Sequence, residues 1–167
     1  IKAELKVQEP NLIISFEEIK PAKEVMGLGA QGKFIKAVYA AHNGVYTMSA
    51  SIDGLVETSN NIARILVKDG KVAIACLTRS SVDSVKLDLA NSLRSVFELG
   101  GFDVEFSGSY PGWNPNPDSE ILSITKNTYI DLFKEEPKVI ACHAGLECGI
   151  LGQNYPDIDM VSFGPTI

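Results

Sequence analysis

The stretch "LVETSNNIARILVKDGKVAIACLTR", Leu55 to Arg79, decides the fold. Two strand-like runs in it are separated by Asp69-Gly70, a dipeptide that favours the type I′ turn of a two-residue hairpin. A third run precedes them, so the pattern predicts an antiparallel meander. The three predicted strands are Val45 to Ile52, Leu55 to Val67 and Lys71 to Thr78.

Helical patterns flank this meander on both sides. After it, Ser80 and Asp83 have the spacing of a capping box, and an apolar stripe continues to Gly100-Gly101. Before it, residues 34–41 form a second apolar face, although the glycines that precede this face weaken the helical pattern. We therefore expect an α+β fold, an antiparallel sheet with two helices on one face.

Other alternating runs predict strands outside the meander. Two lie near the start of the chain, on either side of a Glu9-Pro10 turn, and another follows the second helix. The predicted ranges are Ala3 to Gln8, Asn11 to Glu17 and Phe102 to Ser107.

A proline-rich linker, "SYPGWNPNPDS" from Ser109 to Ser119, separates this first part from the rest. Asn116 is the expected cap of a helix that runs to about Lys134. Buried strands at 138–142 and 159–163, with a short helix at 145–151 between them, complete an α-β-α-β piece. The expected units are residues 1–110 and 111–167, and both ends of the sequence look cut.

Composition excludes several classes of protein. With 167 residues and 45% hydrophobic residues, the chain can bury a core of its own. Its formal charge of −6 argues against a nucleic-acid partner, and without a polybasic segment or an apolar run of membrane-spanning length we expect no membrane partner. Three cysteines are few for a secreted domain of this size, so we expect reduced thiols and a cytoplasmic location.

The cluster from Cys142 to Cys148 suggests two kinds of chemistry. In a helix, His143 and Glu147 would share a face and could bind a metal ion. Cys142 beside His143 could be a thiol nucleophile, but neighbours on a strand point to opposite faces, which disfavours the pairing. A buried structural cysteine is the more common outcome.

Arg79 and the Asn60-Asn61 pair are the other candidates. Arg79 ends a strand just before a helix and could clamp a carboxylate through a bidentate contact. The simpler alternative is a surface ion pair with Asp83. Asn60-Asn61 could likewise be no more than a turn or a bulge.

Five blocks of sequence taken together resemble the aminoacyl-histidine dipeptidases, the carnosine-cleaving branch of the dinuclear zinc peptidases. The blocks are "NGVYTMSASIDGLVETSNN", "RSSVDS", "YPGWNPNPDS", "HAGLECGIL" and "YPDIDMVSFGPTI". The resemblance implies a catalytic α/β domain that holds two zinc ions and a lid domain that closes over a short peptide such as Xaa-His and often forms the homodimer. Residues 1–110 would then be an incomplete lid, and residues 111–167 would be the return into the catalytic domain.

The resemblance also assigns roles to residues. The zinc ligands and the catalytic glutamate of the family fall outside this sequence, so we expect no catalytic residue and no metal ligand in it, and no hydrolysis by the chain alone. Asn61 and Arg79 match substrate-binding residues of the lid, Arg79 for the terminal carboxylate. Gly145, Leu146 and Glu147 match a loop that lines the cleft. His42 does not replace a lid histidine that relatives use. The competing hypothesis is a self-contained dimerisation or binding module without enzymatic activity.

Overall fold

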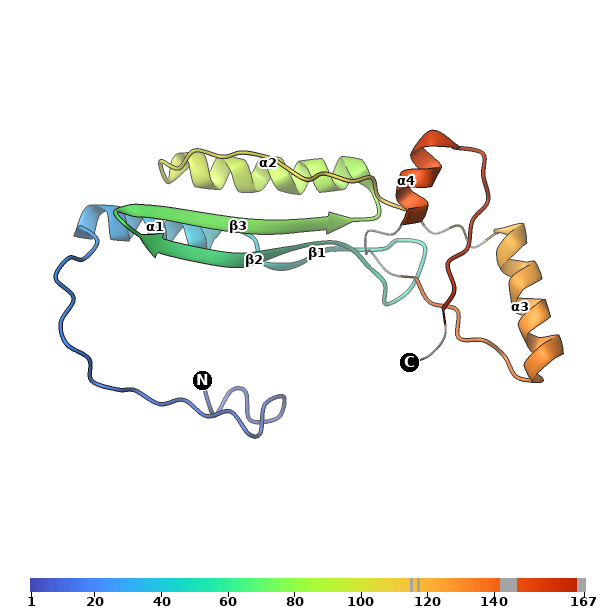
Figure 1. The fold of residues 1–167 in the computed structure, drawn as a ribbon, viewed down its shortest axis with the longest axis horizontal. Coiled ribbons are helices and arrows are strands. Elements are labelled where there is room, and N and C mark those ends of the chain that lie inside the picture. The colour runs from blue at the N-terminus through green and yellow to red at the C-terminus, as the bar shows by residue number, and fades with distance from the viewer. Residues whose placement is uncertain (115, 117, 142–146, 165–167) are drawn as a thin grey trace.

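The computed structural model describes residues 1–114, 116, 118–141 and 147–164. Within these residues, three strands form an antiparallel sheet in the order β1-β2-β3, and four helices accompany it (Figure 1). The elements are α1 (Leu28–Ala40), β1 (Gly44–Met48), β2 (Val56–Lys68), β3 (Lys71–Ser80), α2 (Asp83–Leu99), α3 (Glu120–Phe133) and α4 (Glu147–Asn154). The expected α+β fold is confirmed.

The β2–β3 hairpin is the longest element of the sheet, and the sequence predicted its turn correctly. Asp69 and Gly70 have φ angles of 52° and 72°, as a type I′ turn requires, and Lys68 pairs with Lys71. A bulge between Ile62 and Arg64 interrupts the register of β2 against β3. An extra residue in one strand changes which side chains face each side of the sheet.

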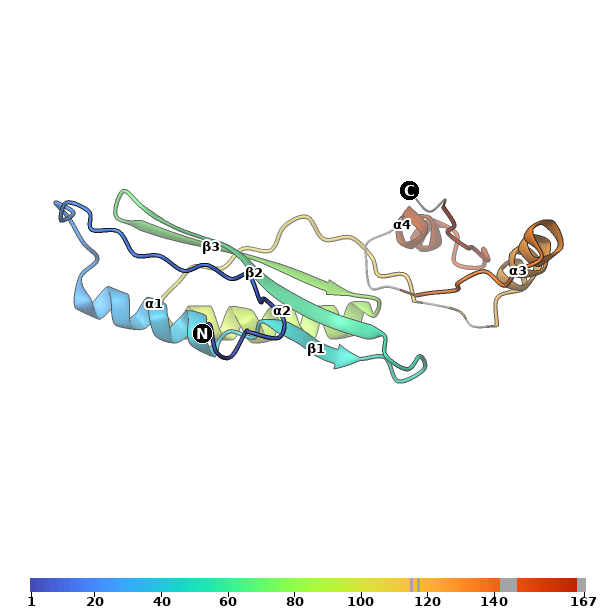
Figure 2. The ribbon, with the colours of Figure 1, turned by 90° about the horizontal axis from the view of Figure 1, so that it is seen from below.

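Helices α1 and α2 pack together over the middle of the hairpin, and Figure 2 shows them running along the strands. Leu89 of α2 is completely buried at the centre of the core. Its buried neighbours are Ala37, Ala41, Leu93 and Phe97, and the partly buried side chains around them are Ile62, Ile74, Val96, Phe102 and Val104. The apolar stripe predicted for the second helix therefore faces the sheet.

Two predicted helix caps are wrong. Helix α2 has Val82 as its N-cap without a side-chain hydrogen bond, because Ser80 is still part of β3 and its hydroxyl accepts from the Val82 N–H at 3.0 Å. Helix α3 is capped by Ser119, whose Oγ accepts from the Leu122 N–H at 3.0 Å. Asn116 instead closes a turn of its own before the helix.

Strand β1 is shorter than predicted because a turn begins at Ser49. The Ser49 N–H donates to the Leu55 carbonyl at 2.8 Å, and the Ser49 hydroxyl accepts from the N–H groups of Ser51 and Ile52. These bonds reverse the chain, so β1 ends at Met48 and not at Ile52.

The predicted strands outside the meander do not form in the described residues. Residues 3–8 adopt turns, with the Glu9 N–H bonded to the Leu5 carbonyl, and residues 11–17 are irregular and mostly exposed. Residues 102–107 run beside α2, where the Arg94 guanidinium lies 3.9 Å from the centre of the Phe106 ring. Residues 138–141 and 159–163 are also irregular. A strand needs a neighbouring strand to satisfy its backbone, and none adjoins these segments.

Candidate functional site

The face of the sheet away from α1 and α2 carries both predicted lid residues. Side chains alternate along β3, and because Ile74 packs against the core, Leu77 and Arg79 point to the opposite, open face. Asn61 pairs with Leu77 and Ser59 pairs with Arg79 in the register, so Asn61 and Arg79 are diagonal neighbours on this face. Both side chains are exposed.

The alternative role of Arg79, an ion pair with Asp83, is not what the structure has. The Asp83 carboxylate accepts from Lys86 Nζ at 2.5 Å and from the Gly112 N–H at 3.0 Å. Burial alone would raise the pKa of Asp83, but these hydrogen bonds and the Lys86 charge lower it overall. Within the described part of the chain Arg79 has no ion pair, so its guanidinium remains available to a carboxylate from outside.

The linker after residue 109 is held against the same end of the sheet. Lys86 Nζ donates to the Tyr110 carbonyl at 2.5 Å, which fixes the start of the linker to α2. At Gly112 an added Cβ would lie 2.5 Å from the Ser81 carbonyl oxygen, so only glycine allows this approach. The linker therefore passes directly beside the residue pair that follows Arg79.

Helix α4 packs against this linker. A Cβ at the buried Gly149 would lie 2.8 Å from the Pro111 carbonyl oxygen. Glu147, the first residue of α4, is exposed two residues before this contact. Helix α4 lies beyond the end of β3, the strand end that carries Arg79 (Figure 1). Gly145 and Leu146, the other predicted cleft residues, lie outside the described residues, as do Cys142 and His143.

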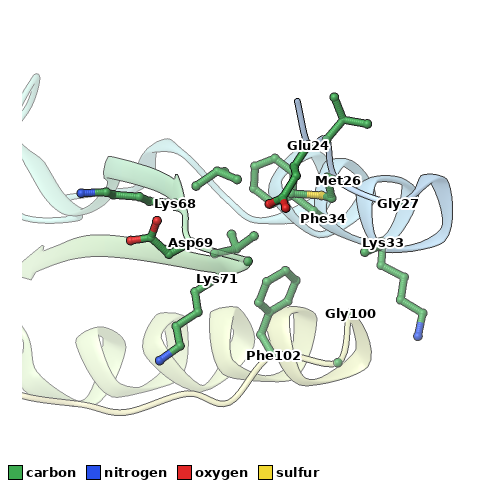
Figure 3. A pocket seen from close by; sticks show the side chains of 16 residues that line it. Glu24, Met26, Gly27, Lys33, Phe34, Lys68, Asp69, Lys71, Gly100 and Phe102 are labelled. Atoms are coloured by element: carbon green, nitrogen blue, oxygen red, sulfur yellow. The ribbon is translucent and has the colours of Figure 1, made fainter. Parts of the chain in front are cut away.

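A hollow of about 610 Å³ lies at the opposite end of the sheet, at the hairpin tip (Figure 3). It is bounded by the start of α1, the Asp69-Gly70 turn and Gly100 to Phe102. Phe34 of α1 and Phe102, which follows α2, line it, and the side chains of Lys33, Lys68 and Lys71 also line it. Of the predicted site residues that the structure describes, Asn61, Arg79 and Glu147, none lines this hollow, so it is separate from the Arg79 end.

The described residues do not favour a metal site or a reactive thiol. Across 1–114, 116, 118–141 and 147–164, no three His, Cys, Asp or Glu side chains lie close enough to hold a metal ion. The pKa of the Cys76 thiol is raised overall, because partial burial raises it more than a hydrogen bond with Asn60 lowers it. The His42 ring nitrogen Nε2 is 3.0 Å from the Val45 carbonyl oxygen, within the turn that leads into β1. The described residues therefore do not fit a zinc pair.

A buried polar set behind the open face was missed by sequence reasoning. Thr58, Asn60 and Ser80 are almost completely buried on the helix-facing side, and Asn60 is part of β2, not of a turn. Thr58 and Ser80 lie opposite each other, as do Asn60 and Thr78. The available signal was the unbroken run of four polar residues from 58 to 61, which resembles a loop when the partner strand is unknown.

Comparison with known proteins identifies relatives along the whole chain. No protein-family model matches it. The cytosol non-specific dipeptidase of Escherichia coli K12 is 38% identical over 167 residues, which are all of this chain and 34% of that protein. The crystal structure of aminoacylhistidine dipeptidase from Vibrio alginolyticus is 43% identical with a TM-score of 0.88, over 99% of this chain and 34% of that one.

This chain is similar to part of each of these two dipeptidases. It spans about a third of the length of the relatives that it matches. The sequence-based resemblance to the aminoacyl-histidine dipeptidases is therefore confirmed by sequence and by fold. Among the described helices, none is long and apolar enough to cross a membrane.

Proposed function

We propose that this chain is part of a longer cytoplasmic dipeptidase and supplies the surface that holds the peptide. The proposed substrate is a short peptide such as Xaa-His. Arg79 binds its terminal carboxylate through a bidentate contact, and Asn61 binds a peptide polar group beside it. The similarity to one third of two dipeptidases supports the family, and the open face supports the role of these two residues.

One observation carries the proposal: Asn61 and Arg79 lie diagonally on one exposed face, at the sheet end where the linker and α4 converge. A guanidinium without an ion pair in the described residues, next to an exposed amide, is suited to recognise a carboxylate and a peptide group together. Gly145, Leu146 and Glu147 would line the other side of the same cleft.

The metal chemistry is proposed to reside elsewhere in the longer polypeptide. Two zinc ions would supply activated water, with ligands from outside these 167 residues, because the described residues contain no suitable cluster. The chain alone would then bind no zinc pair and hydrolyse nothing. It would contribute binding, orientation and enclosure of the substrate.

The decisive test compares two arginines of the open face in the longer dipeptidase. Arg64 pairs with Ala75, two residues before Leu77 on the same face, and lies beyond the bulge from Asn61. We expect Arg79→Ala to raise KM for a dipeptide roughly tenfold or more, because a hydrogen-bonded charge is lost, while Arg64→Ala has little effect.

A second substrate separates carboxylate binding from general damage to the enzyme. With a dipeptide amide, which has no terminal carboxylate, Arg79→Ala should cost much less than with the free acid. An equal loss on both substrates, or equal effects of Arg64→Ala and Arg79→Ala, would show that Arg79 does not bind the carboxylate.

We also propose that this part of the enzyme forms the homodimer. Strands β1 and β3 are the edges of the sheet in the described structure, and an unpaired edge can pair with a second copy. Sedimentation equilibrium of the purified chain should give twice the 18.0 kDa monomer mass. A monomer at all concentrations would remove this element of the proposal.

A further inference from the structure

The covered face of the hairpin is polar at its Arg79 end, where a sheet packed on helices is usually apolar. Thr58 is 0% exposed and Asn60 is 2% exposed. Thr58 Oγ1 lies 2.7 Å from Ser80 Oγ, and Thr78 Oγ1 donates to Asn60 Oδ1 at 3.0 Å. On this face of the ladder, two neighbouring pairs are thus joined by side-chain hydrogen bonds.

Asn60 makes a further hydrogen bond. Its amide Nδ2 donates to the His42 carbonyl at 2.8 Å, in the turn between α1 and β1. No buried polar side-chain atom of the described residues lacks a partner. Asn60 therefore joins β2 to β3 on one side and to the start of β1 on the other.

Because of the bulge, the hairpin turn alone does not determine the register of β2 against β3 at the Arg79 end. The Asp69-Gly70 turn sets the pairing only as far as Arg64 with Ala75, because Ala63 is then skipped. If the bulge moved toward the start of β2, the tip register would continue, with Asn61 opposite Thr78 and Asn60 opposite Arg79. A shift of one residue moves each side chain to the other face of the sheet.

The local sequence makes such a shift chemically easy. Residues 58–61 are Thr-Ser-Asn-Asn, two hydroxyl side chains followed by two amides. In the shifted register Ser59 would replace Thr58 opposite Ser80, and Asn61 would replace Asn60 opposite Thr78. Both rungs would keep similar hydrogen bonds, so the rungs alone do not select the observed register.

We propose that the buried Asn60 amide, through its additional bond to the His42 carbonyl, fixes the bulge at Ala63 and so keeps Asn61 on the open face beside Arg79. Asn60 is a positioning residue, and its purpose rests on the substrate-binding role proposed for Asn61 and Arg79. The register itself depends on contacts within the chain and not on the substrate; one of these contacts, beside the same turn, is the Ile62 N–H, which donates to Asn43 Oδ1 at 2.8 Å.

The first test replaces each asparagine in turn in the 167-residue chain and follows by NMR the Hα–Hα and HN–HN NOEs, which join directly opposite residues of an antiparallel pair. Asn60→Ala should produce NOEs between residues 61 and 78, because Asn61 can now take the bond to Thr78. Asn61→Ala, the matched control, should retain only the NOEs between residues 61 and 77. If Asn60→Ala showed only the original NOEs between residues 61 and 77, the proposal would be overturned.

A milder variant covers the case in which Asn60→Ala does not fold. Asn60→Ser keeps a small hydroxyl in the buried position but is too short to keep the bond to His42, and it should show the same 61–78 NOEs. Thr47→Val removes a different cross-strand bond, from Thr47 Oγ1 to Glu57 at 3.1 Å. It should leave the β2–β3 register unchanged, and a shift there would also contradict the assignment to Asn60.

The consequence for binding is measured separately, in the longer dipeptidase. Asn60→Ala should raise KM as much as Asn61→Ala does and leave kcat little changed, although Asn60 itself is buried. A shifted register with an unchanged KM would retain the role of Asn60 and refute the role of Asn61 in binding. An unshifted register refutes the role of Asn60 whatever the kinetics show.

Discussion

Gly112 is the residue at which the linker meets the sheet, and its size decides whether the two can touch. An added Cβ would lie within 2.8 Å of the carbonyl oxygens of both Ser80 and Ser81, which are fixed backbone atoms. The contact is also held by the hydrogen bond from the Gly112 N–H to Asp83. A side chain here must displace the linker from the end of the sheet that carries Arg79.

We predict that Gly112→Ala detaches the linker and lowers the melting temperature. Trp113 is the only tryptophan of the chain and is half-buried, so its fluorescence reports on the linker directly. Its emission should shift to longer wavelength in the variant. The control is Gly29→Ala in α1, where the Cβ meets open space and a helical alanine should stabilise by about 0.5–1 kcal/mol. Unchanged Trp113 emission in Gly112→Ala would contradict the predicted displacement.

Asp159 ties the last described segment to the start of α3. Its Oδ2 accepts from the Ile121 N–H at 3.0 Å and from the Ser119 hydroxyl at 2.9 Å. These bonds lower the pKa of the Asp159 carboxyl, and the bond from the Ile121 N–H has the largest effect. A carboxylate at a helix N-terminus is also favoured by the helix dipole.

The pH dependence of this contact follows from the direction of the shift. The folded pKa is below the unfolded value of about 3.9, so the contribution to stability is present above that pH and is lost as the pH falls through the folded pKa. The protection of the amides in the first turn of α3, relative to their intrinsic exchange rates, should therefore fall below about pH 4. Asp159→Asn should remove this dependence, and the same acid response in both proteins would refute the assignment to Asp159.

At the scale of elements, local signals predicted the hairpin and α2, and long-range partners decided the rest. Asp69-Gly70 encodes its turn through two positive φ angles, which neighbours need not impose. The alternation at residues 11–17 and 102–107 is equally regular, but no strand adjoins either segment in the structure. Ser80 failed as a cap because pairing with Thr58 retains it in β3. The residue pattern of a segment does not reveal whether another strand lies beside it.

The strongest prediction for an element concerns Leu89, which α2 places at the centre of the core with 0% exposure. Leu89→Ala should cost about 2–5 kcal/mol of unfolding free energy, from lost burial and the cavity that remains. Leu99→Ala is the matched control on the same helix, since Leu99 is 90% exposed and its loss should cost less than about 0.5 kcal/mol. Urea denaturation measures both, and similar losses would show that α2 does not pack as described.

For the whole molecule, the arrangement concentrates the proposed binding surface at one end. The hairpin carries Asn61 and Arg79 there, the linker crosses beside them, and α4 packs on the linker, with α3 beyond (Figure 1). Residue patterns alone left Asn61 as a possible turn and Arg79 as an ion-pair partner of Asp83. The family resemblance selected these two residues, and the structure places them on one face.

The remaining part of the site was beyond sequence reasoning for physical reasons. Asn60 is buried only because β3 and the turn at His42 close around it, and no spacing within β2 reveals that. Gly145 and Leu146 remain predictions from the resemblance, and the structure adds the position of Glu147 alone.

The central claim is that this chain binds the substrate while the metal ligands lie outside it. The most direct test is whether the purified 167-residue chain hydrolyses a peptide when zinc is supplied. The account predicts no cleavage of an Xaa-His dipeptide at any zinc concentration, since the described residues contain no metal cluster and are proposed only to bind the substrate. Zinc-dependent turnover that copurifies with the chain and disappears in Arg79→Ala would contradict it.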